Sequence, residues 1–379
     1  MKVMEMNELQ KDLQSFAREF AQKEIAPIAP QIDHDHGEFP MDVFHKFCDA
    51  GFNTMFLPEE YGGQGLGAME EVIIGEEFCK ADAGFYVSAT TGAFGIEPVL
   101  LFGNEEQKHY YADYLLQGKL ASFALTEADA GSDASNTRTT AVRDGDDYIL
   151  NGSKCFITSG GLADIYTVFA TVDRSKGVKG ITCFIVERSR EGVSVGKAED
   201  KMGMVLSNTT ELIFDNVRIP AKNRVGEEGE GFKIAMASLD RSRGIYSYGA
   251  LGVAQRAIDV AVDYAKQRKT FGKPIIKHQG IQFMLADMEI QTTAARSLLW
   301  HCAQMVDEGN IDSRMGAITK TFCSDACMKV TTDAVQILGG YGYSREYPVE
   351  KLMRDAKLLQ IFEGTNQIQR IVISREMSR

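Results

Sequence analysis

The stretch Ser122-Phe123-Ala124-Leu125-Thr126 marks the point at which the sequence pattern changes. It is typical of a β-strand, and short strand-like runs bounded by turn residues follow it as far as Phe214. On both sides of this region, apolar residues recur at helical spacing instead. The sequence therefore predicts helices, then strands, then helices again. We expect three domains, at residues 1–116, 117–228 and 229–379.

The predicted class is an α+β multidomain protein. An N-terminal all-α domain precedes a compact antiparallel β domain, and long periodic stretches with short links then predict a C-terminal four-helix bundle. The expected helices cover residues 7–25, 42–50, 68–79, 93–102, 105–116, 231–267, 279–307, 314–337, 345–356 and a last segment from 366, and the later expected strands cover 148–150, 164–172, 180–187, 192–195 and 210–214.

Composition narrows the class further. The 379 residues are 44% hydrophobic and 25% charged, which is ordinary for a soluble globular protein. The net charge of −12 argues against nucleic acid as the main partner. Seven cysteines without a CxxC pair favour a reduced setting and no metal site. No signal peptide or membrane-spanning run is found, which predicts a cytoplasmic protein without membrane insertion; a processed mitochondrial matrix form stays open.

Two formal motifs are not interpreted as sites. Asp33-His34-Asp35-His36 resembles a metal cluster, but no further ligand is near, so we interpret it as a solvated turn. The stretch 63–68 matches the dinucleotide pattern GxGxxA, which requires a preceding strand. Pro58-Glu59-Glu60-Tyr61 cannot form that buried strand, so the dinucleotide interpretation is rejected.

Glu363 is the first candidate for chemistry. It stands between the apolar Ile361-Phe362 and Gly364. Burial would raise its pKa, and the glycine would let a ligand or main chain come close, which suits a general base. The alternative is an ordinary first-turn glutamate stabilised by a helix dipole.

Polar clusters elsewhere are individually weak signals. Residues 126–133 and 154–161 contain hydroxyls and glycines, and both are expected as loops on the β domain that could orient a planar ligand. The alternatives are an ordinary surface turn for the first and an edge strand followed by a tight turn for the second. Asp240 and Arg243 share a helix face. Two further segments supply an arginine (268–272) and a glycine-rich turn (336–343), and an arginine near such a turn could bind phosphate.

Taken in order, these motifs resemble the acyl-CoA dehydrogenase family over nearly the whole chain. The matching stretches are Leu125-Thr126-Glu127, Gly131-Ser132-Asp133, Phe156-Ile157-Thr158, Thr209-Thr210-Glu211-Leu212, Val217-Arg218-Ile219-Pro220, Arg268-Lys269-Thr270-Phe271-Gly272, Gln336-Ile337-Leu338-Gly339-Gly340, Arg354-Asp355-Ala356-Lys357 and Ile361-Phe362-Glu363-Gly364-Thr365.

The resemblance implies FAD as cofactor and a homotetramer, a dimer of dimers. The flavin would lie between the β domain and the bundle, with Thr158 near its reactive edge. Part of the bundle would reach the FAD of a neighbouring subunit. The implied cofactor contacts are Leu125, Thr126, Gly131, Ser132, Phe156, Thr158, Thr365 and Gln367, with Arg268, Phe271, Gln279, Gln336, Gly339 and Gly340 for the neighbour's FAD.

The resemblance also implies the reaction. Glu363 would remove the α-proton of an acyl-CoA thioester, flavin N5 would accept the β-hydride, and electrons would pass to electron-transferring flavoprotein. The main-chain N–H of Glu363 would polarise the thioester carbonyl. The implied substrate contacts are Ser132, Asp240, Arg243 and Gly364 for the thioester arm and Tyr86, Thr90, Thr91 and Phe94 for the acyl group.

Departures from the family pattern bear on specificity. Phe156 stands where many members have Trp, Ala128-Asp129 replaces a frequent Pro-Gly, and residues 204–206 lack a usual Arg. Ser242 occupies the position from which some relatives supply the base, which leaves Glu363 as the base here. No arginine lies near the acyl-contact residues, which argues against dicarboxyl substrates, and the bulky side chains there favour short, branched or cyclic acyl groups.

Two other functions remain as alternatives. The same site could run in reverse as an enoyl-CoA reductase, since redox poise and electron partner decide the direction. A flavin-bearing, nucleic-acid-associated relative is disfavoured by the acidic charge and by the intact Glu363-Gly364-Thr365.

Overall fold

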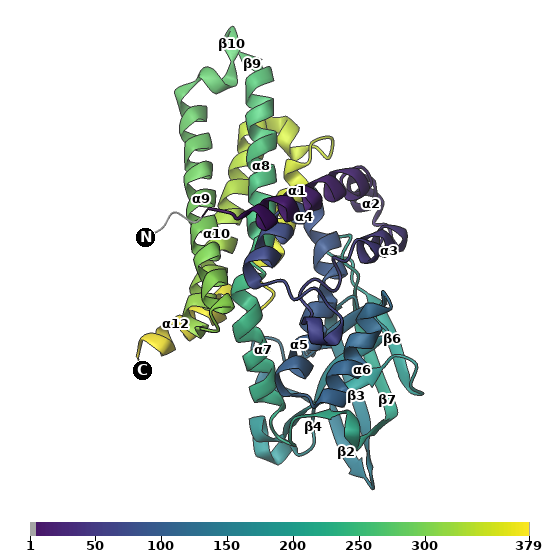
Figure 1. Cartoon of the computed structure of the whole chain (residues 1–379). Helices are drawn as coiled ribbons and strands as arrows, with labels where there is room; N and C mark the ends of the chain where they lie inside the picture. The colour runs from purple at the N-terminus through teal and green to yellow at the C-terminus, as the bar shows by residue number, and fades with distance from the viewer. Residues whose placement is uncertain (1–4, 379) are drawn as a thin grey trace.

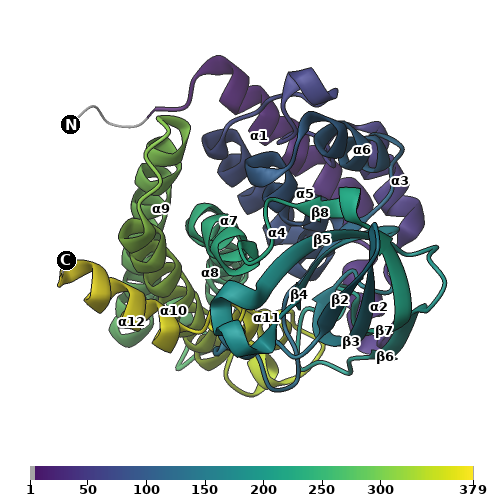
Figure 2. The same cartoon turned by 90° about the horizontal axis from the view of Figure 1, so that it is seen from below.

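A single twisted sheet lies beside two groups of helices in the computed structural model, which describes residues 5–378 (Figure 1). The long helices α9, α10 and α12 form the side farthest from the sheet, and α7 and α8 lie between (Figure 2). The helices are α1 Glu8–Phe20, α2 Ala29–Asp35, α3 Met41–Asp49, α4 Ala68–Ala89, α5 Thr91–Phe102, α6 Glu105–Leu116, α7 Gly231–Ile245, α8 Tyr248–Gln267, α9 Gln279–Asp307, α10 Ser313–Leu338, α11 Val349–Leu359 and α12 Asn366–Met377.

The sheet is mixed rather than purely antiparallel. Its order is β6-β7-β3-β2-β4-β5-β8, and β1 pairs with β4. The pairings of β4 with β1 and with β2 are parallel, because long connections return the chain to β4 in the same direction. The strands are β1 Ala121–Ala124, β2 Thr140–Asp144, β3 Asp147–Thr158, β4 Ile165–Thr171, β5 Ile181–Glu187, β6 Val193–Ala198, β7 Thr209–Pro220 and β8 Arg224–Val225; a short hairpin, β9 Lys269–Thr270 and β10 Lys273–Pro274, lies apart from the sheet.

Helices cover the strands at the centre of the sheet. Every residue of β4 and β5 is buried, because α5 and α7 pack against this part of the sheet. The sequence pattern missed β2, whose outward side chains are polar apart from an exposed Val142. It also predicted strands that were shorter than β3 and β7. Each of these strands runs for 12 residues, and their pairing contains register shifts.

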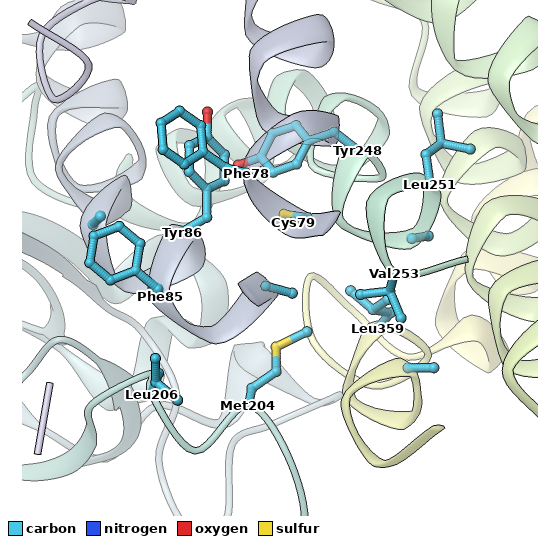
Figure 3. Close-up of a cluster of buried hydrophobic side chains, with 14 of the residues drawn as sticks. Phe78, Cys79, Phe85, Tyr86, Met204, Leu206, Tyr248, Leu251, Val253 and Leu359 are labelled. Carbon is cyan, nitrogen blue, oxygen red and sulfur yellow. The ribbon is translucent and has the colours of Figure 1, made fainter. Parts of the chain in front are cut away.

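A buried ionic cluster joins the N-terminal and C-terminal helices. Helix α4 breaks at Asp82, whose backbone is extended (φ −161°, ψ 117°). Lys351 donates to the carboxylates of Asp82 (2.7 Å) and Asp355 (2.6 Å), and Asp355 also accepts from the main-chain N–H of Met204 (2.5 Å). Figure 3 shows buried apolar side chains of the same core, among them Cys79 and Phe85 of α4, Met204 and, from α11, Leu359. The break in α4 therefore has a defined ionic partner in α11.

The interpretation of Asp33-His34-Asp35-His36 as a solvated turn is wrong. The first three of these residues complete α2, and Asp33 is buried. Its carboxylate accepts two hydrogen bonds from Arg354, at 2.6 and 3.2 Å. Apolar periodicity gave no signal here because the helix is short and carries this buried charge.

Within residues 5–378, no single helix is long and apolar enough to cross a membrane. The bent pair α4–α5, at 47°, passes the same test of length and composition. No group of three or more His, Cys, Asp or Glu side chains among these residues could hold a metal ion.

Candidate active site

Glu363 lies in a tight turn between α11 and α12. Its backbone is left-handed (φ +57°), and so is that of Gly364 (φ +86°). A left-handed conformation is uncommon for a residue other than glycine and marks a site where surrounding contacts impose it. Thr365 is the N-cap of α12 and accepts from the N–H of Ile368, so Glu363 precedes the helix. The alternative interpretation of Glu363 as a first-turn helix glutamate is therefore wrong.

The Glu363 carboxylate points into a small pocket. Its Oε2 accepts a hydrogen bond from Ser242 Oγ at 3.0 Å. Burial raises the pKa of Glu363 to about 7, while the Ser242 hydrogen bond and the charges of Arg243 and Lys320 act to lower it. Such a carboxylate exchanges its proton near neutral pH, as a general base must. The other residues that line the pocket are Tyr246, Ser247, Ala250, Ser324, Leu359 and Phe362.

Helix α7 brings Asp240, Ser242 and Arg243 to the same place. Arg243 is 5% exposed and pairs with Asp240 at 2.8 Å. Ser313 donates to the same Asp240 oxygen at 2.8 Å, and Arg243 Nη1 donates to Gln369 Oε1 at 3.3 Å. Of the predicted thioester-arm residues, Asp240 and Arg243 thus lie near the predicted base, whereas Ser132 lies on the exposed loop after β1.

The loop after β1 is held from below by a buried lysine. Lys154 Nζ donates to the main-chain oxygen of Leu125 (2.9 Å) and to Glu127 Oε1 (2.6 Å). Burial lowers the pKa of Lys154 to about 8. Burial also acts to raise the pKa of Glu127, but the Lys154 ammonium and hydrogen bonds from residues 138 and 139 hold that pKa below its ordinary value. Cys155 N donates to Thr126 O at 2.9 Å, so the loop is fixed against β3.

Phe156 stands on β3 beside this loop. The segment 154–161, expected to be a loop, is instead the end of a strand followed by a turn, because register shifts let β3 continue to Thr158. Phe156 is left-handed (φ +56°) and 62% exposed. Ser122 Oγ donates to Thr158 O at 2.8 Å, and Gly131 and Ser132 are exposed on the neighbouring loop.

A series of contacting aromatic rings extends from Tyr246, which lines the pocket. The ring of Tyr246 lies 5.8 Å from Phe94 and 5.6 Å from Tyr248, and Tyr248 lies 5.3 Å from Tyr86. Figure 3 shows Tyr248 directed toward the stacked rings of Tyr86 and Phe78. The hydroxyl of Thr90 donates to Tyr86 O at 2.7 Å, so its hydrogen bond is made to the main chain at the end of α4.

A separate cavity of about 770 Å³ lies at the far end of the bundle. Arg268, Phe271, Gly339 and Gly340 line it, and Phe271 is 95% exposed. The hairpin β9–β10 at this end is remote from the sheet (Figure 1). One chain therefore does not bring these residues together with Phe156. Gln279, at the start of α9, and Gln336, in the last turn of α10, are exposed and do not line the cavity.

Three family models cover almost the whole chain. The acyl-CoA dehydrogenase N-terminal domain matches residues 7–119, the middle domain 122–217 and the C-terminal domain 229–378. This chain belongs to the acyl-CoA dehydrogenase family. The family assignment and the expected fold are thereby confirmed, apart from the parallel strand pairs described above.

Similar acyl-CoA dehydrogenases share the full length of the chain. An acyl-CoA dehydrogenase of Bacillus subtilis is 47% identical over 98% of both chains. The structure of butyryl-CoA dehydrogenase from Megasphaera elsdenii is 44% identical over 100% of both chains, with a TM-score of 0.96. A chain in a structure described as the electron transferring flavoprotein of Acidaminococcus fermentans, concerning flavin-based electron bifurcation, is 46% identical over 100% of both chains, with a TM-score of 0.97.

Two reductases are also among the relatives. Acryloyl-CoA reductase (NADH) of Anaerotignum propionicum is 43% identical over 98% of this chain and 94% of the relative. A 3-(aryl)acrylate reductase of Clostridium sporogenes is 44% identical over 96% of this chain and 97% of the relative.

Acyl-CoA dehydrogenases are FAD-dependent, and the residues on this β domain fit a flavin. An exposed aromatic ring in a left-handed backbone stands next to main-chain groups fixed by Lys154 and Cys155. A flat ring system can stack on such a side chain while the loop offers hydrogen bonds to its polar edge.

Four residues at the candidate site of this family member were not identified from the sequence. Lys154 and Lys320 are lysines at buried positions of β3 and α10, a placement that could have drawn attention, because lysine is almost never buried without a partner. Gln369 is likewise buried in an otherwise polar helix. Tyr246 carried no signal, since a tyrosine between two helices most often packs in a core.

Proposed function

We propose that this chain catalyses the FAD-dependent α,β-dehydrogenation of a short acyl-CoA thioester, with Glu363 as the base that removes the α-proton. The observation that carries the proposal is the Glu363 carboxylate, whose pKa is raised to about 7 beside Arg243. A base with this pKa is half ionised at neutral pH, so it can both accept and release a proton there. Bound FAD supplies the hydride acceptor.

The chain's own groups divide the remaining tasks. Asp240 and Arg243 are proposed to hold the thioester arm, and the main-chain N–H of Glu363 is proposed to donate to the thioester carbonyl as negative charge develops there. A donor of this kind is worth about 3 kcal/mol in the transition state. Tyr246 and Phe362 line the pocket with the carboxylate, and burial there keeps its pKa raised.

The aromatic lining supports a short acyl group. Tyr86, Tyr246, Tyr248 and Phe94 occupy the space beyond Glu363 through the ring contacts given above. A long saturated chain would have to displace several of these buried rings, whereas an acyl group of a few carbons, or a flat ring, needs less space. The butyryl-CoA dehydrogenase neighbour agrees with this proposal.

The test is Glu363→Gln, which keeps the shape and removes the base. FAD should remain bound, while bleaching of the flavin by butyryl-CoA under anaerobic conditions should slow by about 10²–10⁴-fold. The exposed Glu19→Gln is the matched control and should bleach at the wild-type rate. Wild-type bleaching in Glu363→Gln would refute the role of the base.

A second candidate is the reverse reaction, reduction of an enoyl-CoA. The two reductases among the relatives favour it specifically. The experiment compares saturated with unsaturated thioesters: butyryl-CoA should bleach the oxidised flavin, and crotonyl-CoA should reoxidise the flavin after dithionite reduction. If only the second reaction occurs at a useful rate, the enzyme is a reductase.

We further propose a homotetramer, arranged as a dimer of dimers in the cytoplasm, that exchanges electrons with electron-transferring flavoprotein. The cavity at Arg268 and Gly339, remote from Phe156 in the same chain, supports an assembly in which each bundle completes a neighbour's cofactor site. Sedimentation of the FAD-loaded protein tests the assembly. Phe271→Ala should weaken FAD binding and leave the Glu363 pocket intact.

A further inference from the structure

Gln369 has no assigned role, yet it touches both the base-bearing turn and the buried arginine. It belongs to the first turns of α12 and is completely buried. Its Nε2 donates to Glu363 O at 2.9 Å and to Gly364 O at 3.1 Å. Its Oε1 accepts from Arg243 Nη1 at 3.3 Å. One amide therefore uses both of its ends within the site.

These contacts fix the orientation of the amide. A side-chain amide has one accepting and one donating end, and the guanidinium offers only donors whereas the two carbonyls offer only acceptors. The opposite orientation would bring donors against donors and acceptors against acceptors. A glutamine amide therefore satisfies both neighbours at every pH, whereas a glutamate of the same length would do so only while protonated.

The turn needs such support because its backbone is unfavourable. Glu363 at φ +57° is followed by Gly364 at φ +86°, and a left-handed residue other than glycine costs of order 1–3 kcal/mol. A Cβ at position 364 would lie 2.7 Å from Gln369 Nε2, so the glycine is what admits the amide to the turn. Lys320 Nζ donates to Gly364 O at 2.8 Å from the other side.

On the basis of the proposed function, we propose that Gln369 is a positioning residue that links Arg243 to the main chain of the Glu363–Gly364 turn. The guanidinium that holds the thioester arm and the main-chain segment that carries the base are then kept at a fixed distance by one side chain. Movement of either group is transmitted to the other through the amide.

The first experiment uses Gln369→Met, which keeps the length and removes both polar ends. With butyryl-CoA and FAD-loaded enzyme, kcat should fall by about 10²-fold, because small misplacements of a catalytic group have effects of this size. The exposed Gln22→Met is the matched control and should keep the wild-type kcat. A wild-type kcat in Gln369→Met would overturn the proposal.

A second variant separates the two ends of the amide. Gln369→Glu keeps an acceptor for Arg243 and, when ionised, has no donor for the carbonyls. Its kcat should fall as in Gln369→Met, and hydrogen exchange of residues 360–365 should quicken in both. If Gln369→Glu has wild-type kcat and exchange at a pH where the new carboxyl group is ionised, the donor function is excluded. This variant also serves if Gln369→Met fails to fold.

The pH profile distinguishes positioning from a general loss of stability. The groups that face Glu363 are Ser242 and Arg243 from α7, Lys320 from α10, and Tyr246 and Tyr248 nearby; Asp240 is paired to Arg243. If Gln369→Met releases Arg243, the pH of half-maximal kcat/KM should rise. A lower kcat with an unchanged profile and unchanged exchange would refute the link.

A double-mutant cycle completes the test. If the amide links the two groups, the effects of Gln369→Met and Arg243→Lys on kcat should not multiply, whereas independent effects would contradict the link. The outcomes also separate this inference from the function itself. An active Glu363→Gln variant refutes the proposed base, whereas an inactive Glu363→Gln with a fully active Gln369→Met refutes only the role of Gln369.

Discussion

Two buried lysines support the two halves of the candidate site, and they do so differently. Lys154 donates to Leu125 O under the flavin loop, and Lys320 donates to Gly364 O under the base-bearing turn. The pKa of each is lowered to about 8 by burial. Lys154 also touches a carboxylate, Glu127, at 2.6 Å. Lys320 instead touches the neutral Asn366 Oδ1 at 2.8 Å and has the charge of Glu363 only at longer range.

The difference follows from what each region has to do. Under the flavin loop, the charges of Lys154 and Glu127 cancel. Neither residue has to change protonation in the proposed reaction, so the loop after β1 can keep one conformation throughout. Under the turn, the charge of the base Glu363 acts on Lys320 more strongly than that of Asp325 does. Protonation of Glu363 removes that counter-charge, so the second lysine is coupled to the proton transfer while the first is isolated from it.

The largest effect is expected for Lys154→Met. It leaves the Glu127 carboxylate buried without its partner, which typically costs about 3–5 kcal/mol of unfolding free energy. Denaturant unfolding and FAD titration measure the loss. The double variant Lys154→Met with Glu127→Leu removes both charges and should recover most of the stability; if it does not, the lysine acts through the Leu125 carbonyl rather than the ion pair.

Glu363→Gln should stabilise the FAD-loaded protein at high pH. Its folded pKa of about 7 lies above the unfolded value near 4.5, so the folded wild type binds an extra proton between these pH values. Wild-type stability therefore falls as pH rises from 4.5 to 7, and the cost, at most about 3 kcal/mol, is complete above pH 7. The variant should gain this amount at pH 8 and nothing at pH 4. Equal unfolding free energies at pH 8 would contradict the raised pKa.

Lys320→Met should lower the free energy of unfolding by about 1–2 kcal/mol, which is less than the effect of Lys154→Met. The variant removes a donor from neutral oxygen acceptors and breaks no buried ion pair. The pKa of Glu363 should rise once the neighbouring cation is gone. The pH profile of butyryl-CoA oxidation should therefore move to higher pH. The exposed Lys23→Met is the control. If the pH profile of Lys320→Met does not move, Lys320 is no more coupled to the proton transfer than Lys154 is.

Ser242→Ala should give the smallest effect. The hydroxyl stabilises ionised Glu363 through one hydrogen bond, so its removal should shift the same profile upward by less than about one pH unit. The exposed Ser374→Ala serves as control. A downward shift would mean that Ser242 acts on the protonated carboxyl instead.

The helices were the best predicted part of the fold. Apolar periodicity located α6 and α9 to the residue, because each helix buries one face and exposes the other. It failed at α2, where a buried Asp33–Arg354 pair replaces an apolar contact. It also failed on β2, and the parallel neighbours of β4 could not be inferred, because strand order depends on contacts distant in sequence.

The candidate site was predicted only in part. Sequence motifs named Glu363, Asp240 and Arg243, which the fold does bring together. They did not indicate Lys320 or Gln369, because the value of a buried polar side chain depends on which carbonyl it meets in the folded chain. The sequence also did not predict the left-handed backbone of Glu363, because the contacts that impose it exist only in the folded chain.

The ionic cluster at Lys351 has a consequence for biosynthesis. Lys351 meets Asp82 across 269 positions of sequence, and Arg354 meets Asp33 across 321. Such contacts form only after nearly the whole chain has left the ribosome, since N-terminal parts of a chain fold first during synthesis. The helix that ends at the base-bearing turn, α11, is thus anchored late in synthesis. A ribosome-stalled fragment that ends before α11 would contain the loop after β1 and Phe156 but would lack Glu363.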